Sequence, residues 1–277
     1  MTAPGAGARR TRVPAALARA CHPAPTVAVT AVAVLLAAVA DAGLRTGAVV
    51  GAAVLTGQLS IGWSNDLLDA DRDAQVGRTD KPVAAGEVSR AAVRAALAVV
   101  LLLCAVASLA LGPAAGLVHL VAVVGSGWAY NVGLKRTVWS AVPYVVAFGS
   151  LPAVVWLAAD SRLPPAWVAA TGALLGLGAH LLNVLPDLAD DAATHVRGLP
   201  HRLGARGSGL LALGSLTAAS AATVVGPAGP TPGWAWVVLV AVAALAVAAP
   251  RAGGRAPFLA ALVIALTDVV LLAVRGL

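Results

Sequence analysis

Long apolar runs recur along the whole sequence, and they constrain the fold more than any other feature. Runs of Ala, Val and Leu reach the roughly 20 residues that a helix needs to cross a bilayer. A soluble helix would interrupt such runs with a polar face. The chain is 60% apolar and 11% charged, whereas soluble domains are about half apolar and a quarter charged. We predict nine spans, at residues 25–41, 46–65, 89–111, 114–131, 138–158, 165–186, 208–226, 233–249 and 257–274.

The fold class that follows is an all-α, polytopic membrane bundle of about nine transmembrane helices. The N-terminal arm and the connections after the even-numbered spans share one face, which holds 16 of the 19 Lys and Arg residues. The positive-inside rule places this face in the cytoplasm. We therefore expect residues 1–22 to form a cytoplasmic arm and residues 23–277 to form the transmembrane domain, in the cell inner (plasma) membrane. The excess of Lys and Arg in cytoplasmic loops of membrane proteins explains the net charge of +7. We therefore expect no nucleic-acid partner.

Acidic residues cluster far more tightly than a loop on this face requires. Nine of the twelve lie in residues 66–87 and 187–191. Both clusters contain the pattern N-x-x-x-D-x-x-x-D, formed by Asn65, Asp69 and Asp73 and by Asn183, Asp187 and Asp191. On a helix, each four-residue step drifts about 40° around the axis and rises about 6 Å, so the three side chains form one ridge. One such ridge also fits a solvated helix end, but two on the same face predict paired Mg²⁺ sites around a diphosphate.

Basic residues follow both acidic motifs. Arg78 and Lys81 come after the first motif, and Arg197 comes after the second. A third connection on the same face supplies Tyr130, Asn131, Lys135 and Arg136. Arg and Lys bind phosphate oxygens directly. The three connections therefore combine metal-binding acids with phosphate-binding bases.

Several further polar and aromatic residues lie within the predicted spans. Tyr144 and Phe148 are four residues apart and share a helix face, where aromatic rings can stabilise a cation; for Phe148, ordinary packing is the alternative. His180 precedes Asn183 by three residues and is either a hydrogen-bonded packing residue or a group that binds the acceptor or handles a proton. Asp268 is a lone acid in the last span, either paired with a neighbouring polar group or involved in transport.

The sequence resembles the UbiA superfamily of intramembrane prenyltransferases from about residue 20 to the C-terminus. The segments that carry the resemblance are NDLLDADRD at 65–73, RTDKP at 78–82, YNVGLK at 130–135 and NVLPDLADD at 183–191. The resemblance implies nine helices around a central, lipid-accessible cavity. It also implies Mg²⁺-dependent transfer of a prenyl group from an allylic isoprenyl diphosphate to an aromatic or lipid acceptor within the membrane.

The resemblance also implies roles for individual residues. Asn65, Asp69 and Asp73 would hold one Mg²⁺, and Asp187 and Asp191 a second, while Lys135 and Arg78 would neutralise the diphosphate. Asn183 stands where the family varies between Asp and Asn, and Tyr130 would lie near the allylic end. The candidate catalytic residues are Asp69, Asp73, Asp187, Asp191 and Lys135. The candidate substrate-binding residues are Asn65, Asp66, Arg78, Lys81, Tyr130, Asn131, Arg136, Tyr144, His180, Asn183 and Arg197.

Two departures from the family pattern bear on the acceptor. Four residues separate Tyr130 from Lys135, where many relatives have three. The second motif also lacks the tyrosine that often precedes it in ubiquinone-pathway members. The alternatives are a membrane terpene cyclase, which needs no acceptor, and a cation-coupled transporter. Transporters usually place ionisable residues near the bilayer midplane, whereas these residues cluster at one face, which favours an enzyme.

Overall fold

The computed structural model describes residues 6–188, 191, 196–252 and 256–275, and this part of the chain contains helices and no strand. In chain order the α-helices are α1 (Ala6–Ala20), α2 (Pro23–Val39), α3 (Gly43–Gln75), α4 (Arg90–Ala110), α5 (Pro113–Val118), α6 (Gly125–Val132), α7 (Val142–Asp160), α8 (Ala166–Val184), α10 (Leu199–Val225), α11 (Gly233–Ala252) and α12 (Ala256–Arg275). A π-helical segment, His119–Val124, joins α5 to α6. Short 3₁₀ segments cover Leu134–Arg136, Val138–Ala141 and Leu185–Asp187.

The membrane-spanning segments follow the predicted order. Within the described chain, 7 helical segments are long and apolar enough to cross a bilayer, with α5 and α6 forming one continuous span. Part of α1 and the whole of α2 meet the same criterion as a pair bent by 66°, and Gly233–Ala249 in α11 is a shorter apolar helix. The polytopic all-α class is thus confirmed, and about nine spans is an approximate count.

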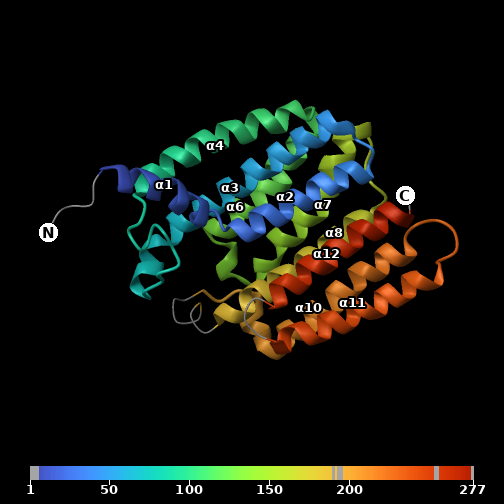
Figure 1. The fold of residues 1–277 in the computed structure, drawn as a ribbon. Coiled ribbons are helices and arrows are strands. Elements are labelled where there is room, and N and C mark those ends of the chain that lie inside the picture. Colours follow the sequence, from blue (N-terminus) through green and yellow to red (C-terminus); the bar gives the residue numbers. More distant parts are fainter. Residues whose placement is uncertain (1–5, 189–190, 192–195, 253–255, 276–277) are drawn as a thin grey trace.

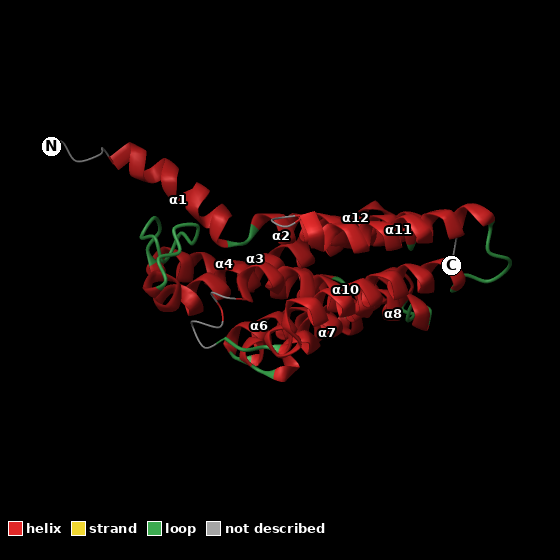
Figure 2. Ribbon diagram, turned by 90° about the horizontal axis from the view of Figure 1, so that it is seen from below, coloured by secondary structure: helices red, strands yellow, loops and turns green. Residues whose placement is uncertain are grey.

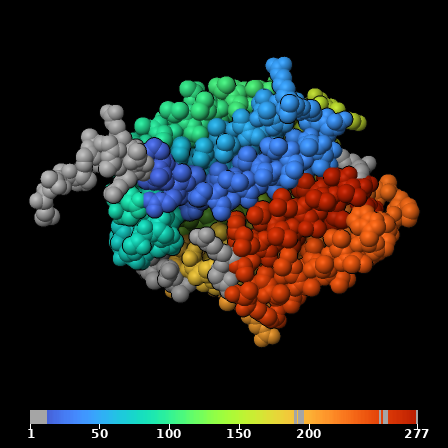
Figure 3. Space-filling model, in the orientation of Figure 1, coloured from blue at the N-terminus to red at the C-terminus, as the bar shows by residue number. Residues whose placement is uncertain are grey.

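The first and last spans lie side by side and close the bundle. α12 packs against α2, α8 and α10, and Figure 1 shows it running next to α2. The same adjacency is visible on the molecular surface in Figure 3, where the red atoms of α12 border the blue atoms of α2. α1 extends away from the bundle at one end (Figure 2). We call that end, where the acidic motifs lie, the charged end.

Side chains are distributed as a lipid environment requires. Leu102 and Val240 on the outside are 66% and 70% exposed, whereas Ser60, Ser108 and Thr223 are fully buried. Ser60, Ser108 and Thr223 each donate a hydrogen bond to a carbonyl three or four residues earlier in the same helix. Membrane helices pack through such small residues because lipid already satisfies the large apolar ones.

α7 and α8 pack against each other at backbone distance, and glycine makes this possible. A Cβ atom on Gly172 would lie 2.4 Å from the carbonyl oxygen of Phe148, and one on Gly176 would lie 2.5 Å from that of Tyr144. Neither separation leaves room for a side chain. The two glycines therefore bring the backbone that carries Tyr144 and Phe148 directly against α8.

We predict that Gly176→Ala destabilises the protein by about 1–3 kcal/mol, because the added methyl group forces α7 away from α8. Gly214→Ala is the matched control. Gly214 is also in a helix, but its Cβ would meet no atom within 4 Å, so the control should be stabilised by about 0.5–1 kcal/mol. A thiol-reactive dye reports melting in detergent, since Cys21 and Cys104 are both buried. Equal melting temperatures for the two variants would contradict the packing argument.

Candidate functional site

The first acidic motif forms the ridge that its spacing predicts. α3 continues without a break to Gln75, so Asn65, Asp69 and Asp73 follow one another along the same side of the helix. The Nδ2 of Asn65 donates to Oδ2 of Asp69 at 3.0 Å. Asp69 and Asp73 are only 3% and 2% exposed. Two carboxylates are therefore buried at the charged end of the bundle.

Two cations face these carboxylates. The ammonium of Lys135, in the 3₁₀ segment after α6, donates to both oxygens of Asp69 at 2.6 Å. Burial lowers the pKa of Lys135, and the charge of Asp69 opposes this shift. Arg72 bridges the ridge, with its guanidinium 3.1 Å from Asp69 and 3.2 Å from Asp73. Arg72 was not among the predicted site residues. Its position in the sequence between Asp69 and Asp73 would have allowed that prediction.

The second motif is not one unbroken α-helix, which corrects the prediction made from its spacing. α8 ends at Val184, and Leu185–Asp187 form a 3₁₀ turn. Pro186 explains the change, because proline has no N–H for the helical ladder and its ring clashes with the carbonyl four residues earlier. Asp191 lies beyond the turn, with an oxygen 4.0 Å from Nε2 of His201. Asp190 lies outside the described residues.

The two motifs nevertheless meet at one place. Burial raises the pKa of Asp191, while the charges of Arg72 and Lys135 oppose the rise and that of Asp187 adds to it. Arg72 and Lys135 are the same cations that contact Asp69. Asp191 of the second motif therefore lies within electrostatic reach of the two cations that contact Asp69 of the first motif.

The donor set fits a hard divalent cation. Oδ2 of Asp73 is buried and accepts no hydrogen bond from the described residues. Within the same residues, no three His, Cys, Asp or Glu side chains lie close enough to form a complete metal cage. Mg²⁺ requires only one or two carboxylates, because water and phosphate oxygens complete its shell. Asp69 with Asp73, and Asp187 with Asp191, offer that number on each side.

The loop after α3 is held against that helix by Asp66. Asp66 is 1% exposed; its Oδ2 accepts the backbone N–H of Val83 at 3.2 Å, and its Oδ1 lies 3.9 Å from the ammonium of Lys81. Lys81 also reaches Nε2 of His22 at 3.0 Å, and that ring nitrogen lies 3.3 Å from Oδ1 of Asn65. His22 is a site neighbour that no sequence motif indicated. Asp66 acts here as an anchor for the loop.

Arg78, in the same loop, is held by a neighbouring acid. Its guanidinium donates two hydrogen bonds of 2.8 Å to Asp80. This pairing lowers the pKa of Asp80 to about 2. Asp80 raises the pKa of Arg78, and the charges of Asp187 and Asp73 add to that shift. Arg78 therefore lies within electrostatic reach of both acidic motifs.

Aromatic rings form a wall beside the charged groups. The rings of Tyr130 and Tyr144 meet edge to face, with centroids 5.3 Å apart, and Phe148 stacks on Tyr144 at 6.3 Å. His180 packs behind both tyrosines, at 5.8 Å from Tyr130 and 4.9 Å from Tyr144. Its Nε2 lies 3.1 Å from Oγ of Ser140, and the ring is fully buried. In the structure His180 supports the tyrosine rings from behind.

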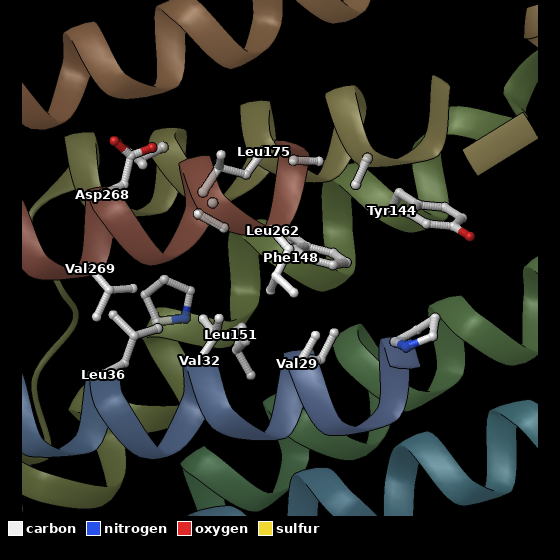
Figure 4. A pocket seen from close by; sticks show the side chains of 18 of the residues that line it. Val29, Val32, Leu36, Tyr144, Phe148, Leu151, Leu175, Leu262, Asp268 and Val269 are labelled. Carbon is white, nitrogen blue, oxygen red and sulfur yellow. The ribbon is translucent and has the colours of Figure 1, made fainter. Parts of the chain in front are cut away.

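Two cavities meet at this wall. One, of about 200 Å³, borders Asn65, Asn131, Tyr130 and Tyr144. The other, of about 140 Å³, runs between α2, α7, α8 and α12 from Tyr144 and Asn183 into the apolar interior. Figure 4 shows Tyr144 at one end of the labelled side chains that line this second cavity, with Phe148 nearer its middle. Both cavities share the lining residues Pro25, Val29, Tyr144 and Phe148.

The remaining predicted residues differ in how close they lie to the acidic ridge on α3. Asn131 binds α6 to α3, since its amide donates to the carbonyl oxygen of Ile61 at 2.8 Å and accepts from Asn65 at 3.2 Å. Asn183 lies beside the hydroxyl of Tyr144. Arg136 and Arg197 are exposed. The structure thus brings the acids, Lys135, Lys81 and the tyrosines together and leaves those two arginines at the surface.

This arrangement of buried acids, cations and an aromatic-lined cavity in a bundle of membrane helices is a candidate membrane-embedded site, and its chemistry suits an anionic, hydrophobic molecule. The UbiA prenyltransferase family matches residues 26–257, and the chain belongs to that family. No curated protein matches it significantly.

Solved structures share the fold at low sequence identity. A UbiA homologue from Aeropyrum pernix K1 is 19% identical with a TM-score of 0.72, over 90% of this chain and 97% of that one. A UbiA homologue from Archaeoglobus fulgidus, bound to DMAPP and Mg²⁺, is 13% identical with a TM-score of 0.70, over 92% and 96%. A digeranylgeranylglyceryl phosphate synthase is 14% identical with a TM-score of 0.65, over 94% and 97%.

We predict that Asp66→Ala frees the loop after α3, because the variant loses the hydrogen bond to Val83 and the contact with Lys81. Trypsin should then cleave after Arg78 several-fold faster than in the unmodified protein. Asp71→Ala is the control, since Asp71 is exposed and contacts Arg90 at the surface, where an ion pair contributes at most about 1 kcal/mol. Equal cleavage rates for both variants would show that Asp66 does not hold the loop.

Proposed function

We propose that this protein transfers a prenyl group from an allylic isoprenyl diphosphate to an aromatic or lipid acceptor within the membrane, with Mg²⁺ as cofactor. The observation that carries the proposal is the meeting of two acidic motifs around shared cations at the mouth of an apolar cavity. The family and the homologue bound to DMAPP and Mg²⁺ support the same chemistry. The excess of Lys and Arg on this face supports a cytoplasmic position for the site at the inner membrane.

Ionisation of the donor is the difficult step. The bond between C1 and the diphosphate oxygen breaks, and its electron pair leaves with the diphosphate. Mg²⁺, held by Asn65, Asp69, Asp73, Asp187 and Asp191, would supply charge stabilisation for the leaving group. Lys135 and Arg78 stabilise the same developing charge as fixed hydrogen-bond donors. Lys81 and Arg72 extend this cationic surface, while exposed Arg136 and Arg197 would contribute at its edge.

The allylic cation must react with the acceptor before water reaches it. Tyr130, Tyr144 and Phe148 present ring faces and edges to the cavities, and a cation is stabilised over an aromatic face. Asn131 and Asn183 orient the groups around these rings. The acceptor donates an electron pair to C1, forming the new bond, and loses its proton. His180 is buried behind the tyrosines, so it positions their rings.

The experiment is a product assay with geranyl, farnesyl and geranylgeranyl diphosphates, with and without aromatic acids or lipid alcohols, in Mg²⁺ or in chelator. A prenylated acceptor formed only with Mg²⁺ supports the proposal. Hydrocarbon released without any acceptor identifies the protein as a membrane terpene cyclase, which the apolar cavity and aromatic wall also suit. Absence of diphosphate release from all three donors contradicts both functions.

We predict that Asp69→Asn and Asp187→Ala each lower turnover at least about a hundredfold, since each removes a carboxylate that would hold the Mg²⁺ needed to stabilise the leaving group. Asp71→Asn is the matched control. Asp71 lies in the same stretch of α3 but its side chain is 80% exposed, so turnover should be unchanged. Turnover is measured as diphosphate release by protein of confirmed melting temperature. Unmodified rates from both site variants would remove the metal-site assignment.

A further inference from the structure

Gln58 lies on the side of α3 that borders the cavity of about 200 Å³. With Ile61, Gly62 and Asn65 it follows the i, i+3, i+4, i+7 spacing of one helix face, and all four residues line the cavity. Gln58 is half-buried and makes no hydrogen bond among the described residues, and both polar atoms of its amide retain accessible surface. The cavity is therefore lined by an amide that can still donate and accept.

The other two amides that line this cavity already have partners within the protein. Asn131 donates to the carbonyl oxygen of Ile61 at 2.8 Å, and Asn65 donates to Asp69 at 3.0 Å and to Asn131 at 3.2 Å. An unpaired amide inside a membrane bundle is costly, and such a group in a native protein calls for an explanation. Gln58 is thus the lining amide whose hydrogen bonds are left for a molecule in the cavity.

The charge around Gln58 restricts what that molecule can be. Among the described residues, no Lys or Arg lines this cavity. His22 lines it, and the ammonium of Lys81 donates to Nε2 of His22 at 3.0 Å, so that nitrogen carries no proton and the ring is neutral. An anionic group beside Gln58 would be buried without a countercharge, which is costly within a membrane. The cavity therefore favours an uncharged polar group at Gln58.

The spacing along α3 limits the size of the molecule. Gln58 lies seven residues before Asn65, which corresponds to about 10 Å along the helix axis. A hydrogen bond to the amide takes about 3 Å of this length, and the rest suits one substituted aromatic ring. Tyr130, Tyr144 and Phe148 line the same cavity and offer ring faces and edges for contact with it.

We propose that Gln58 binds the hydroxyl group of a neutral phenol and thereby selects the acceptor. The inference rests on the proposed function, in which the phenol is the acceptor and the prenyl chain occupies the apolar cavity of Figure 4. The hydroxyl donates to Oε1 of Gln58, so the electron-rich ring carbon opposite the hydroxyl lies toward the acidic ridge. That carbon supplies an electron pair to C1 as the bond from C1 to the diphosphate breaks. Its proton then passes to the released diphosphate.

The test is photolabelling of the full-length protein in detergent, without diphosphate or Mg²⁺. The probes are three phenyl diazirines of the same skeleton that carry a hydroxyl, a hydrogen or a carboxylate. Mass spectrometry measures labelling of α3 and α6 relative to α4, which does not line the cavity. The phenol should label about fivefold to tenfold more than the unsubstituted ring, the effect of about one hydrogen bond, and the carboxylate should label least. Gln58→Met keeps the side-chain length without the amide and should abolish the preference for the phenol.

Thr56→Val is the matched control on the same helix. The hydroxyl of Thr56 donates to the carbonyl oxygen of Ala52 at 2.7 Å, and Thr56 does not line the cavity, so this variant should keep the preference. Equal labelling by the phenol and the unsubstituted ring overturns the proposal, as does an unchanged preference in Gln58→Met or its loss in Thr56→Val. Stronger labelling by the carboxylate than by the phenol also overturns it.

Two features keep the test decisive. If Gln58→Met does not fold, the comparison of the three probes on the unmodified protein decides alone. Because no turnover is required, failure of this test is distinguishable from failure of the prenyl-transfer assay.

Discussion

The contact between Lys135 and Asp69 is the interaction on which the proposed site depends. Both groups are almost fully buried, and the ammonium donates to both carboxylate oxygens at 2.6 Å. A buried charge that loses its partner costs about 3–5 kcal/mol, so each group holds the other in place. The contact joins the end of α6 to the middle of the acidic ridge on α3. It thereby fixes the position of the acidic ridge relative to the aromatic wall that begins at Tyr130.

A second constraint comes from glycine, and it acts on the apolar half of the site. Gly172 and Gly176 allow α7 to contact α8 at backbone distance, which places Tyr144 against His180 and beside Asn183. Ser140 then fixes His180, because its oxygen lies 3.1 Å from Nε2 and also accepts the N–H of Leu199 at 2.9 Å. The wall that separates the two cavities is therefore held by packing from behind.

The sequence predicted the membrane fold and the first acidic motif better than the second motif and the contacts within the site. Apolar run length fixes a membrane helix almost directly, since a bilayer leaves no other way to satisfy the backbone. The ridge on α3 followed from helical spacing alone. The ridge on α8 did not, because Pro186 breaks the helix within the motif. His22 was not predictable, because its contacts with Lys81 and Asn65 depend on the bend between α1 and α2. Arg136 and Arg197 carry the predicted charge but lie at the surface.

Charge balance links the two halves of the proposed substrate complex. Four carboxylates, from Asp69, Asp73, Asp187 and Asp191, face the cations of Arg72, Arg78 and Lys135. A divalent cation alone would be repelled by three positive side chains, and a diphosphate alone would be repelled by four negative ones. Each repulsion is costly where water is scarce. In the proposed complex, the metal would be held by the carboxylates and the phosphate oxygens would accept from the Lys and Arg donors. Lys135 would then exchange one anionic partner for another, so the charge that stabilises the resting fold would also stabilise the leaving group.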